Sequence, residues 1–148
     1  GGLIFYIDNT GQHGLVCAQR DLSFHTWGCN ASGTSAPGGR NGTSTAFGTG
    51  ASNTYAIVTQ CGTINDAANV CYDINLDAFS DWYLPSLDEL SLIYSQLYLN
   101  GIGNLTNNSY WSSSEAASYY SWYVNFSNGS TGYTNKTNYF YVRPVRSF

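Results

Sequence analysis

Two adjacent carboxylates, Asp88 and Glu89, are the side chains whose types and spacing best suit acid–base chemistry in this sequence. Ser86 lies three residues before Glu89, which is the spacing of a capping box at the start of a helix. Two acids in a first helical turn also match the positive end of the helix dipole. Capping therefore explains the pair better than general acid–base catalysis does. The histidines, His13 and His25, form no recognisable set with serine and aspartate, so we predict no catalytic residue and no enzyme.

The sharply marked helix start at residues 81–90, together with the hydroxyl-rich run Tyr-Trp-Ser-Ser-Ser-Glu at residues 110–115, favours a surface-recognition domain over an enzyme core. The aromatic segment at residues 116–140 supplies most of the candidate ligand contacts. Sugars are held by aromatic faces, with amides and hydroxyls fixing their orientation, and sulfated sugars also need lysine or arginine. Strand tyrosines that pack at the edge of a core are the alternative. The predicted ligand contacts are Tyr119, Tyr120, Tyr133, Asn135, Lys136, Arg143 and Arg146.

The four cysteines form two local pairs in the sequence, Cys17 with Cys29 and Cys61 with Cys71. Their spacing is not that of a zinc ribbon or a redox motif, and the histidines do not complete a metal-binding set. We predict no metal and no cofactor, while a calcium ion held by loop oxygens stays open. Short loops close easily, so disulfides 17–29 and 61–71 are expected, with free buried thiols as the alternative. Disulfides would place the chain in an oxidising compartment, secreted or at the cell surface.

Charge is scarce and unevenly distributed along the 148 residues, which fit a single domain over 1–148. Only 9% of residues are charged, the formal net charge is −4, and all nine carboxylates lie at or before Glu115. The last three cations are Lys136, Arg143 and Arg146. We expect them to pair with acids in the fold, such as Glu115 or Asp81; a basic patch for an anionic glycan, with Lys136 as its exposed contact, is the alternative. The composition argues against nucleic acid as a partner, and no apolar run is long enough for membrane insertion.

Periodicity and turn residues predict the secondary structure that must position these side chains. The expected elements are a hairpin at 3–8 and 14–18, a loop at 30–50, a helix capped by Ser52 or Asn53, a helical piece at 66–71, a helix at 86–100, and strands at 110–115, 121–126 and 139–146. Trp82, Trp111 and Trp122 are expected in the core. This order predicts an α+β fold with a mostly antiparallel sheet, two or three short helices, long loops, and paired N- and C-terminal strands.

Several segments together resemble a known family, the Lcl C-terminal domain family, named after a Legionella collagen-like adhesin. They are residues 2–8, 11–15, 27–29, 42–50, 53–54, 81–86 with 88–90, 110–115 and 142–146. The chain is also similar, more distantly, to C-type-lectin-like folds. The resemblance implies an extracellular bacterial adhesin tip, a homotrimer on a collagen-like stalk. Such a tip binds polysaccharide, including sulfated glycosaminoglycans, for attachment to host cells or biofilm. A structural trimerising cap of a surface fibre and a phage-type receptor-binding tip are the alternatives.

Overall fold

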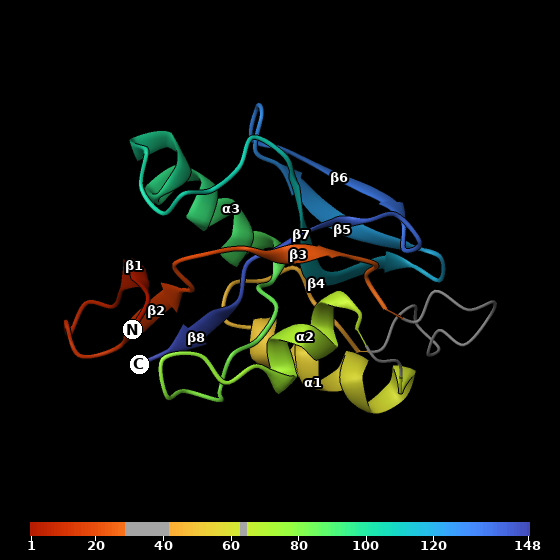
Figure 1. Ribbon diagram of the computed structural model, residues 1–148, viewed down its shortest axis with the longest axis horizontal. Coiled ribbons are helices and arrows are strands. Elements are labelled where there is room, and N and C mark those ends of the chain that lie inside the picture. The colour runs from red at the N-terminus through yellow and green to blue at the C-terminus, as the bar shows by residue number, and fades with distance from the viewer. Residues whose placement is uncertain (29–41, 63–64) are drawn as a thin grey trace.

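The computed structural model describes residues 1–28, 42–62 and 65–148 as three helices and two β-sheets, with one short 3₁₀ turn (Figure 1). The strands are β1 (Leu3–Ile7), β2 (Gly14–Cys17), β3 (Leu22–His25), β4 (Ser109–Ala117), β5 (Tyr120–Asn125), β6 (Ser130–Asn135), β7 (Phe140–Val142) and β8 (Val145–Ser147). The helices are α1 (Gly50–Cys61), α2 (Ala67–Asp73) and α3 (Leu87–Gln96), and the 3₁₀ turn is η1 (Tyr98–Asn100). This is the predicted α+β fold.

A small sheet joins the two ends of the chain in the order β1-β2-β8. The β1–β2 hairpin predicted at residues 3–18 is confirmed, and its second strand pairs with β8 so that Val16 lies opposite Arg146. The expected pairing of N- and C-terminal strands is therefore confirmed. Figure 1 shows both termini on this side of the molecule.

The larger sheet has the order β3-β7-β4-β5-β6, and all its neighbouring strands are antiparallel except β4 and β7. Side chains alternate across β4, so Tyr110 joins the core cluster under α3, whereas Trp111 joins the cluster with residues of α1 and α2. Figure 1 shows α3 on one side of the sheet and α1 with α2 on the other. The likeness to C-type-lectin-like folds stays a prediction.

Helix α3 begins as the sequence predicts. The Ser86 hydroxyl accepts a hydrogen bond from the Glu89 backbone at 3.3 Å, and the Glu89 carboxylate accepts one from the Ser86 backbone at 2.8 Å. This reciprocal pair is the predicted capping box. The helical region ends through η1 at Gly101, whose left-handed conformation provides the predicted stop.

Helix α1 begins earlier than predicted, at Gly50 after the cap residue Thr49. Asn53, one of the two predicted caps, is instead buried inside the first turn and bonded to the backbone of Ser44. A Cβ at position 50 would clash with the Glu89 carboxylate, so glycine is required where this helix start meets α3. The helical piece predicted at 66–71 is α2, which begins after Asp66, whose side chain accepts a hydrogen bond from the Asn69 backbone as its cap.

Both predicted disulfides are wrong, because Cys17 and Cys71 are free, buried thiols. Cys17 packs in the cluster beneath α3, and Cys71 packs with Trp27 in the second cluster. Burial raises the pKa of Cys17 to about 11. Cys61 is disulfide-bonded, and Cys29 and most of the predicted 30–50 loop lie outside the described residues.

Candidate functional site

The aromatic segment predicted to bind ligand forms the edge hairpin of the larger sheet. Strand β6 pairs only with β5 in the described sheet, so its other edge is open. The register places Tyr133 opposite Trp122 and Asn135 opposite Tyr120. Positions two apart on a strand share a face, so these four side chains lie on one face of the hairpin. Val124 continues this face into the core beneath α3.

Tyr120, Trp122 and Tyr133 form a contiguous aromatic row on this hairpin. The ring of Tyr133 lies edge-to-face against both neighbours, with centroids 5.2 Å from Trp122 and 6.1 Å from Tyr120. Tyr133 is 61% exposed and Tyr120 is 43% exposed, whereas Trp122 packs partly against the core. The row therefore presents apolar ring surface to solvent on a rigid strand pair.

Two more predicted contacts lie beside the row. Asn135 is exposed opposite Tyr120, and Tyr119 is 49% exposed in the turn that precedes β5. The Tyr119 carbonyl accepts a hydrogen bond from the Lys136 backbone at 2.9 Å, which ties this turn to the end of β6. The structure thus brings together four predicted contacts from the 116–140 segment, and they supply ring faces, hydroxyl groups and a carboxamide.

The prediction that Lys136 is an exposed contact is wrong. Its side chain is fully buried and ion-paired with Glu115, and it donates a hydrogen bond to the Ser118 carbonyl at 2.9 Å. The ammonium also lies 4.6 Å from the centroid of the Trp27 ring. Strand alternation explains the difference, because Lys136 follows the exposed Asn135 and faces the opposite side of the hairpin.

Arg143 is a second predicted contact that the structure places in the interior. Its guanidinium is buried, pairs with Asp21 at 2.7 Å, and donates to the Ala18 carbonyl at 2.6 Å. The Tyr110 hydroxyl donates to the same aspartate at 2.8 Å. Burial raises the pKa of Asp21, and the Arg143 charge opposes that rise. This network fastens the segment between β2 and β3 to β7, so Arg143 cannot touch a ligand.

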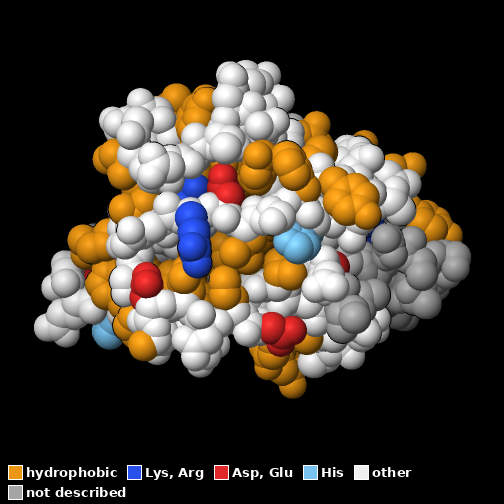
Figure 2. Space-filling view, viewed as in Figure 1, with side chains coloured by type: hydrophobic (Ala, Val, Ile, Leu, Met, Phe, Trp, Pro, Cys, Tyr) orange, Lys and Arg blue, Asp and Glu red, His pale blue; other side chains and the backbone are white. Residues whose placement is uncertain are grey.

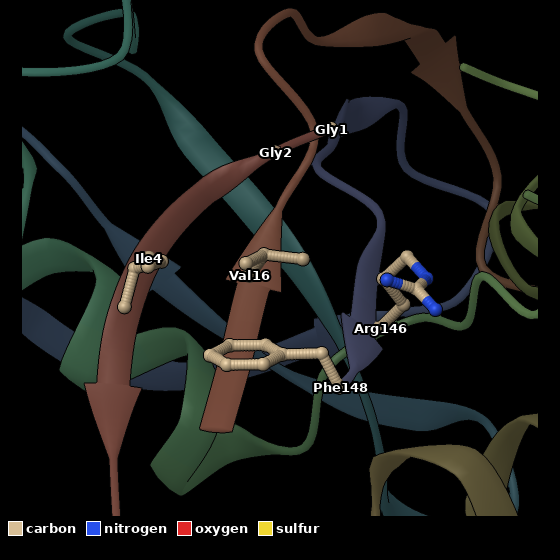
Figure 3. A pocket seen from close by; sticks show the side chains of 6 residues that line it. All are labelled: Gly1, Gly2, Ile4, Val16, Arg146 and Phe148. Carbon is tan, nitrogen blue, oxygen red and sulfur yellow. The ribbon is translucent and has the colours of Figure 1, made fainter. Parts of the chain in front are cut away.

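Arg146 lies on the small sheet, away from the β5–β6 hairpin. It makes two hydrogen bonds to Asp81, of 2.7 and 2.9 Å, and its guanidinium lies 3.9 Å from the centroid of the Phe79 ring. Figure 3 shows it on β8, with Val16 and Phe148 between it and Ile4, and these residues line a shallow groove of about 190 Å³ together with Gly1 and Gly2. The expected pairing of the C-terminal cations with acids is confirmed for all three, and Asp81 is the partner expected here.

The serine run at residues 112–114 is a buried joint and not a recognition surface. All three serines are fully buried. The Ser114 hydroxyl donates to the Ser44 carbonyl at 2.8 Å and accepts from the Leu87 backbone at 3.0 Å. The Ser113 backbone donates to the Pro85 carbonyl at 2.7 Å. These bonds hold residues 42–50 and the start of α3 against β4, a role that the sequence pattern alone did not reveal.

Glu89 belongs to this joint and has no exposed surface for catalysis. Its carboxylate accepts hydrogen bonds from the backbones of Gly48 at 3.0 Å and Ser86 at 2.8 Å. Burial raises the pKa of Glu89, and the hydrogen bonds from backbone groups oppose that rise. Within residues 1–28, 42–62 and 65–148 there is no group of three histidine, cysteine or acidic side chains placed to hold a metal.

The structure is an α+β domain with an exposed aromatic row, and its three C-terminal cations are paired with acids. The chain belongs to the Lcl C-terminal domain family, whose model matches residues 21–146. Membership makes this an adhesin-type surface domain. No curated protein matches the chain. In the part of the chain that the structure describes, every helix is too short or too polar to traverse a bilayer.

Proposed function

We propose that this adhesin-type domain binds polysaccharide through the aromatic row of Tyr120, Trp122 and Tyr133, and so mediates attachment to host cells or biofilm. The observation that carries the proposal is the exposed, edge-to-face ring set on an open sheet edge, with Asn135 beside it. Aromatic rings offer large, rigid surfaces that pack on the C–H faces of sugars, while carboxamide and hydroxyl groups bond sugar hydroxyls.

The charges near the row favour an uncharged polysaccharide over a sulfated glycosaminoglycan. Lys136 is the cation nearest in sequence, and its charge is buried against Glu115. Arg143 and Arg146 are likewise engaged by Asp21 and Asp81. Figure 2 shows a face on which hydrophobic and uncharged side chains predominate. A sulfated chain needs several unpaired cations grouped together. The three C-terminal cations are all paired with acids, so they do not supply such a group.

A glycan array followed by titration of each hit tests the proposal. We expect Tyr133→Ala to weaken binding about tenfold, which corresponds to about 1.4 kcal/mol. Tyr55→Ala is the matched control, because Tyr55 is 60% exposed but lies on α1, and it should leave the affinity unchanged. Binding that does not change in Tyr133→Ala would refute the assignment to the row. Retention on heparin that falls with salt would overturn the preference for an uncharged ligand.

Assembly as a homotrimer, with the domain as a structural cap, is a second candidate function. It is favoured by exposed apolar side chains on or beside the small sheet: Ile4 and Ile7 are each 52% exposed, and Phe148 is 42% exposed. Exposed apolar side chains close together mark interaction sites. Light scattering should then give three times the chain mass, and Ile4→Lys should shift it to the monomer. A monomer at all concentrations would exclude this function.

A further inference from the structure

A hollow of about 370 Å³ lies on the molecule between the bend that follows β2 and the turn that follows α2. Its lining consists of Gln19, Arg20, Leu76 and Asp77. None of these residues belongs to the aromatic row or to the groove beside Arg146. The hollow combines a cation, a carboxylate, a carboxamide and one apolar side chain, so it can donate and accept hydrogen bonds over a partly apolar wall.

One wall of the hollow is a tight turn that is held in place from behind. Leu76 and Phe79 exchange two backbone hydrogen bonds, of 2.9 and 3.0 Å. Asp77 and Ala78, between them, both have positive φ angles, of 55° and 65°. The Trp82 indole donates to the Leu76 carbonyl at 3.3 Å, and the Arg146 guanidinium covers the Phe79 ring. The Asp77 carboxylate therefore projects from a backbone that is already fixed.

The opposite wall is fixed on both sides of Gln19 and Arg20. Before them, the Ala18 backbone donates to the Pro144 carbonyl at 2.8 Å, and its carbonyl accepts from Arg143. After them, Asp21 holds the Arg143 guanidinium at 2.7 Å. Gln19 and Arg20 have exposed side chains, and the residues on either side of them are held in place by these interactions. Preorganised polar groups lose little entropy when a ligand binds.

Arg20 is a basic side chain that the fold leaves available. Among the lysine and arginine side chains of residues 1–28, 42–62 and 65–148, the other three each have a carboxylate within 4.0 Å, and Arg20 does not. It shares the hollow with Asp77 without forming an ion pair with it. One positive and one negative charge make the lining neutral, and the formal net charge of the chain is −4. Neither property favours an anionic ligand.

We propose that this hollow is a second binding site, and that its ligand is one or two units of an uncharged sugar. Arg20 donates to sugar hydroxyls, the Asp77 carboxylate accepts from them, and the Gln19 carboxamide can do both. Leu76 packs on an apolar C–H surface of the ring. The ligand class is that of the proposed function, but the site does not depend on the aromatic row for binding.

Titration of ¹⁵N-labelled protein with methyl glucoside, methyl galactoside and methyl mannoside tests the proposal by NMR. We expect at least one of them to shift the backbone amides of residues 19–20 and 76–78 in a saturable way, with Kd on the order of 1 mM. Arg20→Met and Asp77→Asn should each weaken this binding at least tenfold. Asparagine tolerates the left-handed conformation at position 77, so the second variant changes the charge and keeps the turn.

The aromatic row provides the control that separates the two sites. Tyr133→Ala should leave the shifts at residues 19–20 and 76–78 unchanged, so failure of the row as a glycan site would not remove them. The proposal is overturned if no methyl glycoside gives saturable shifts up to about 100 mM, a range that includes mM affinities. It is equally overturned if only glucuronate or only glycine shifts these amides, because the site would then recognise an anion or a zwitterion. Unchanged binding in Arg20→Met would also refute it.

Discussion

Residues 112–115 of β4 and residues 130–135 of β6 are both rich in hydroxyl groups, and the fold gives them opposite surroundings. Ser112, Ser113 and Ser114 are fully buried, and each of the three makes hydrogen bonds to another part of the chain. In β6 the side chains of Ser130, Tyr133 and Asn135 are exposed. The first stretch is a joint between segments, and the second is a surface that can meet a ligand.

Position in the sheet produces this difference. β4 is the central strand, with helices over both faces, so any hydroxyl there must find a partner inside the protein. β6 is an edge strand, and water can satisfy its polar groups. Polar composition therefore indicates a recognition surface only when the strand lies at an edge, and the strand order is a property of the whole fold.

Lys136 and Asn135 give the largest expected contrast between interior and surface. Lys136→Ala should lower the free energy of unfolding by about 3–5 kcal/mol, because it leaves the buried Glu115 carboxylate without its cation. Asn135→Ala, one residue earlier and exposed, should change it by no more than about 0.5 kcal/mol. Urea titration of both variants measures the difference.

The double variant Lys136→Met/Glu115→Leu sharpens this test, since it removes both charges and keeps apolar volume. It should recover a substantial part of the stability that Lys136→Ala loses. A loss in the double variant as large as in the single one would show that packing around Trp27, and not the unpaired carboxylate, controls the effect.

Two serines give the next contrast. Ser114→Ala removes a hydroxyl that joins the Leu87 backbone to the Ser44 carbonyl, and should cost about 1–3 kcal/mol because two buried groups lose their partner. Ser130→Ala removes an exposed hydroxyl that bonds only the Asn128 side chain, and should stay within about 0.5 kcal/mol. Equal effects in thermal unfolding would contradict the division between joint and surface.

The local parts of this architecture could be predicted from the sequence. The capping box of α3 and the β1–β2 hairpin depend on residues within a few positions of each other, so their patterns are visible in a single sequence. The pairing of the chain ends followed from the order of elements. Tyr119, Tyr120, Tyr133 and Asn135 lie together because they share one hairpin, and their role as ligand contacts stays a prediction.

The predictions that were wrong depend on distant partners. The inward direction of Lys136 requires Glu115 and Trp27, and no spacing in the sequence links the three. Cys17 and Cys71 each lie near another cysteine in sequence, yet both are buried as free thiols, Cys17 in the cluster beneath α3 and Cys71 in the cluster around Trp27. The joint role of the serines requires residues 42–50, which approach β4 only in the folded chain. Long-range packing overrode local inference at each of these positions.

Alanine variants of two tyrosines test whether the aromatic row contributes as little to the free energy of unfolding as an exposed surface should. Tyr133→Ala should lower the free energy of unfolding by no more than about 1 kcal/mol, the scale of cross-strand aromatic pairs. Tyr110, in the central strand and fully buried, is the comparison, and its replacement by alanine should cost several-fold more. Similar losses in chemical denaturation would place the row in the core and remove the basis for a ligand site.

The smallest effect expected is a difference in pH dependence between Glu89, in the joint, and Asp81, near the surface. Burial raises the pKa of Glu89 above its ordinary value of 4.5, whereas hydrogen bonds from Arg146 lower the pKa of Asp81 below 3.8. A carboxyl group whose pKa is raised by folding binds more protons in the folded state. Its contribution to the free energy of unfolding is therefore complete below pH 4.5 and is lost as the pH rises through the folded pKa. The contribution of Asp81 is complete above pH 3.8 and is lost as the pH falls through its folded pKa.

The free energies of unfolding of wild type, Glu89→Gln and Asp81→Asn, measured from pH 3 to pH 7, give the two contributions as differences. Wild type minus Glu89→Gln should fall as the pH rises above 4.5, since only the wild type must ionise a buried carboxyl group. Wild type minus Asp81→Asn should fall as the pH drops below 3.8. Differences that slope in the same direction would mean that the Glu89 carboxyl group is open to water, and that the joint does not differ from the surface in this respect.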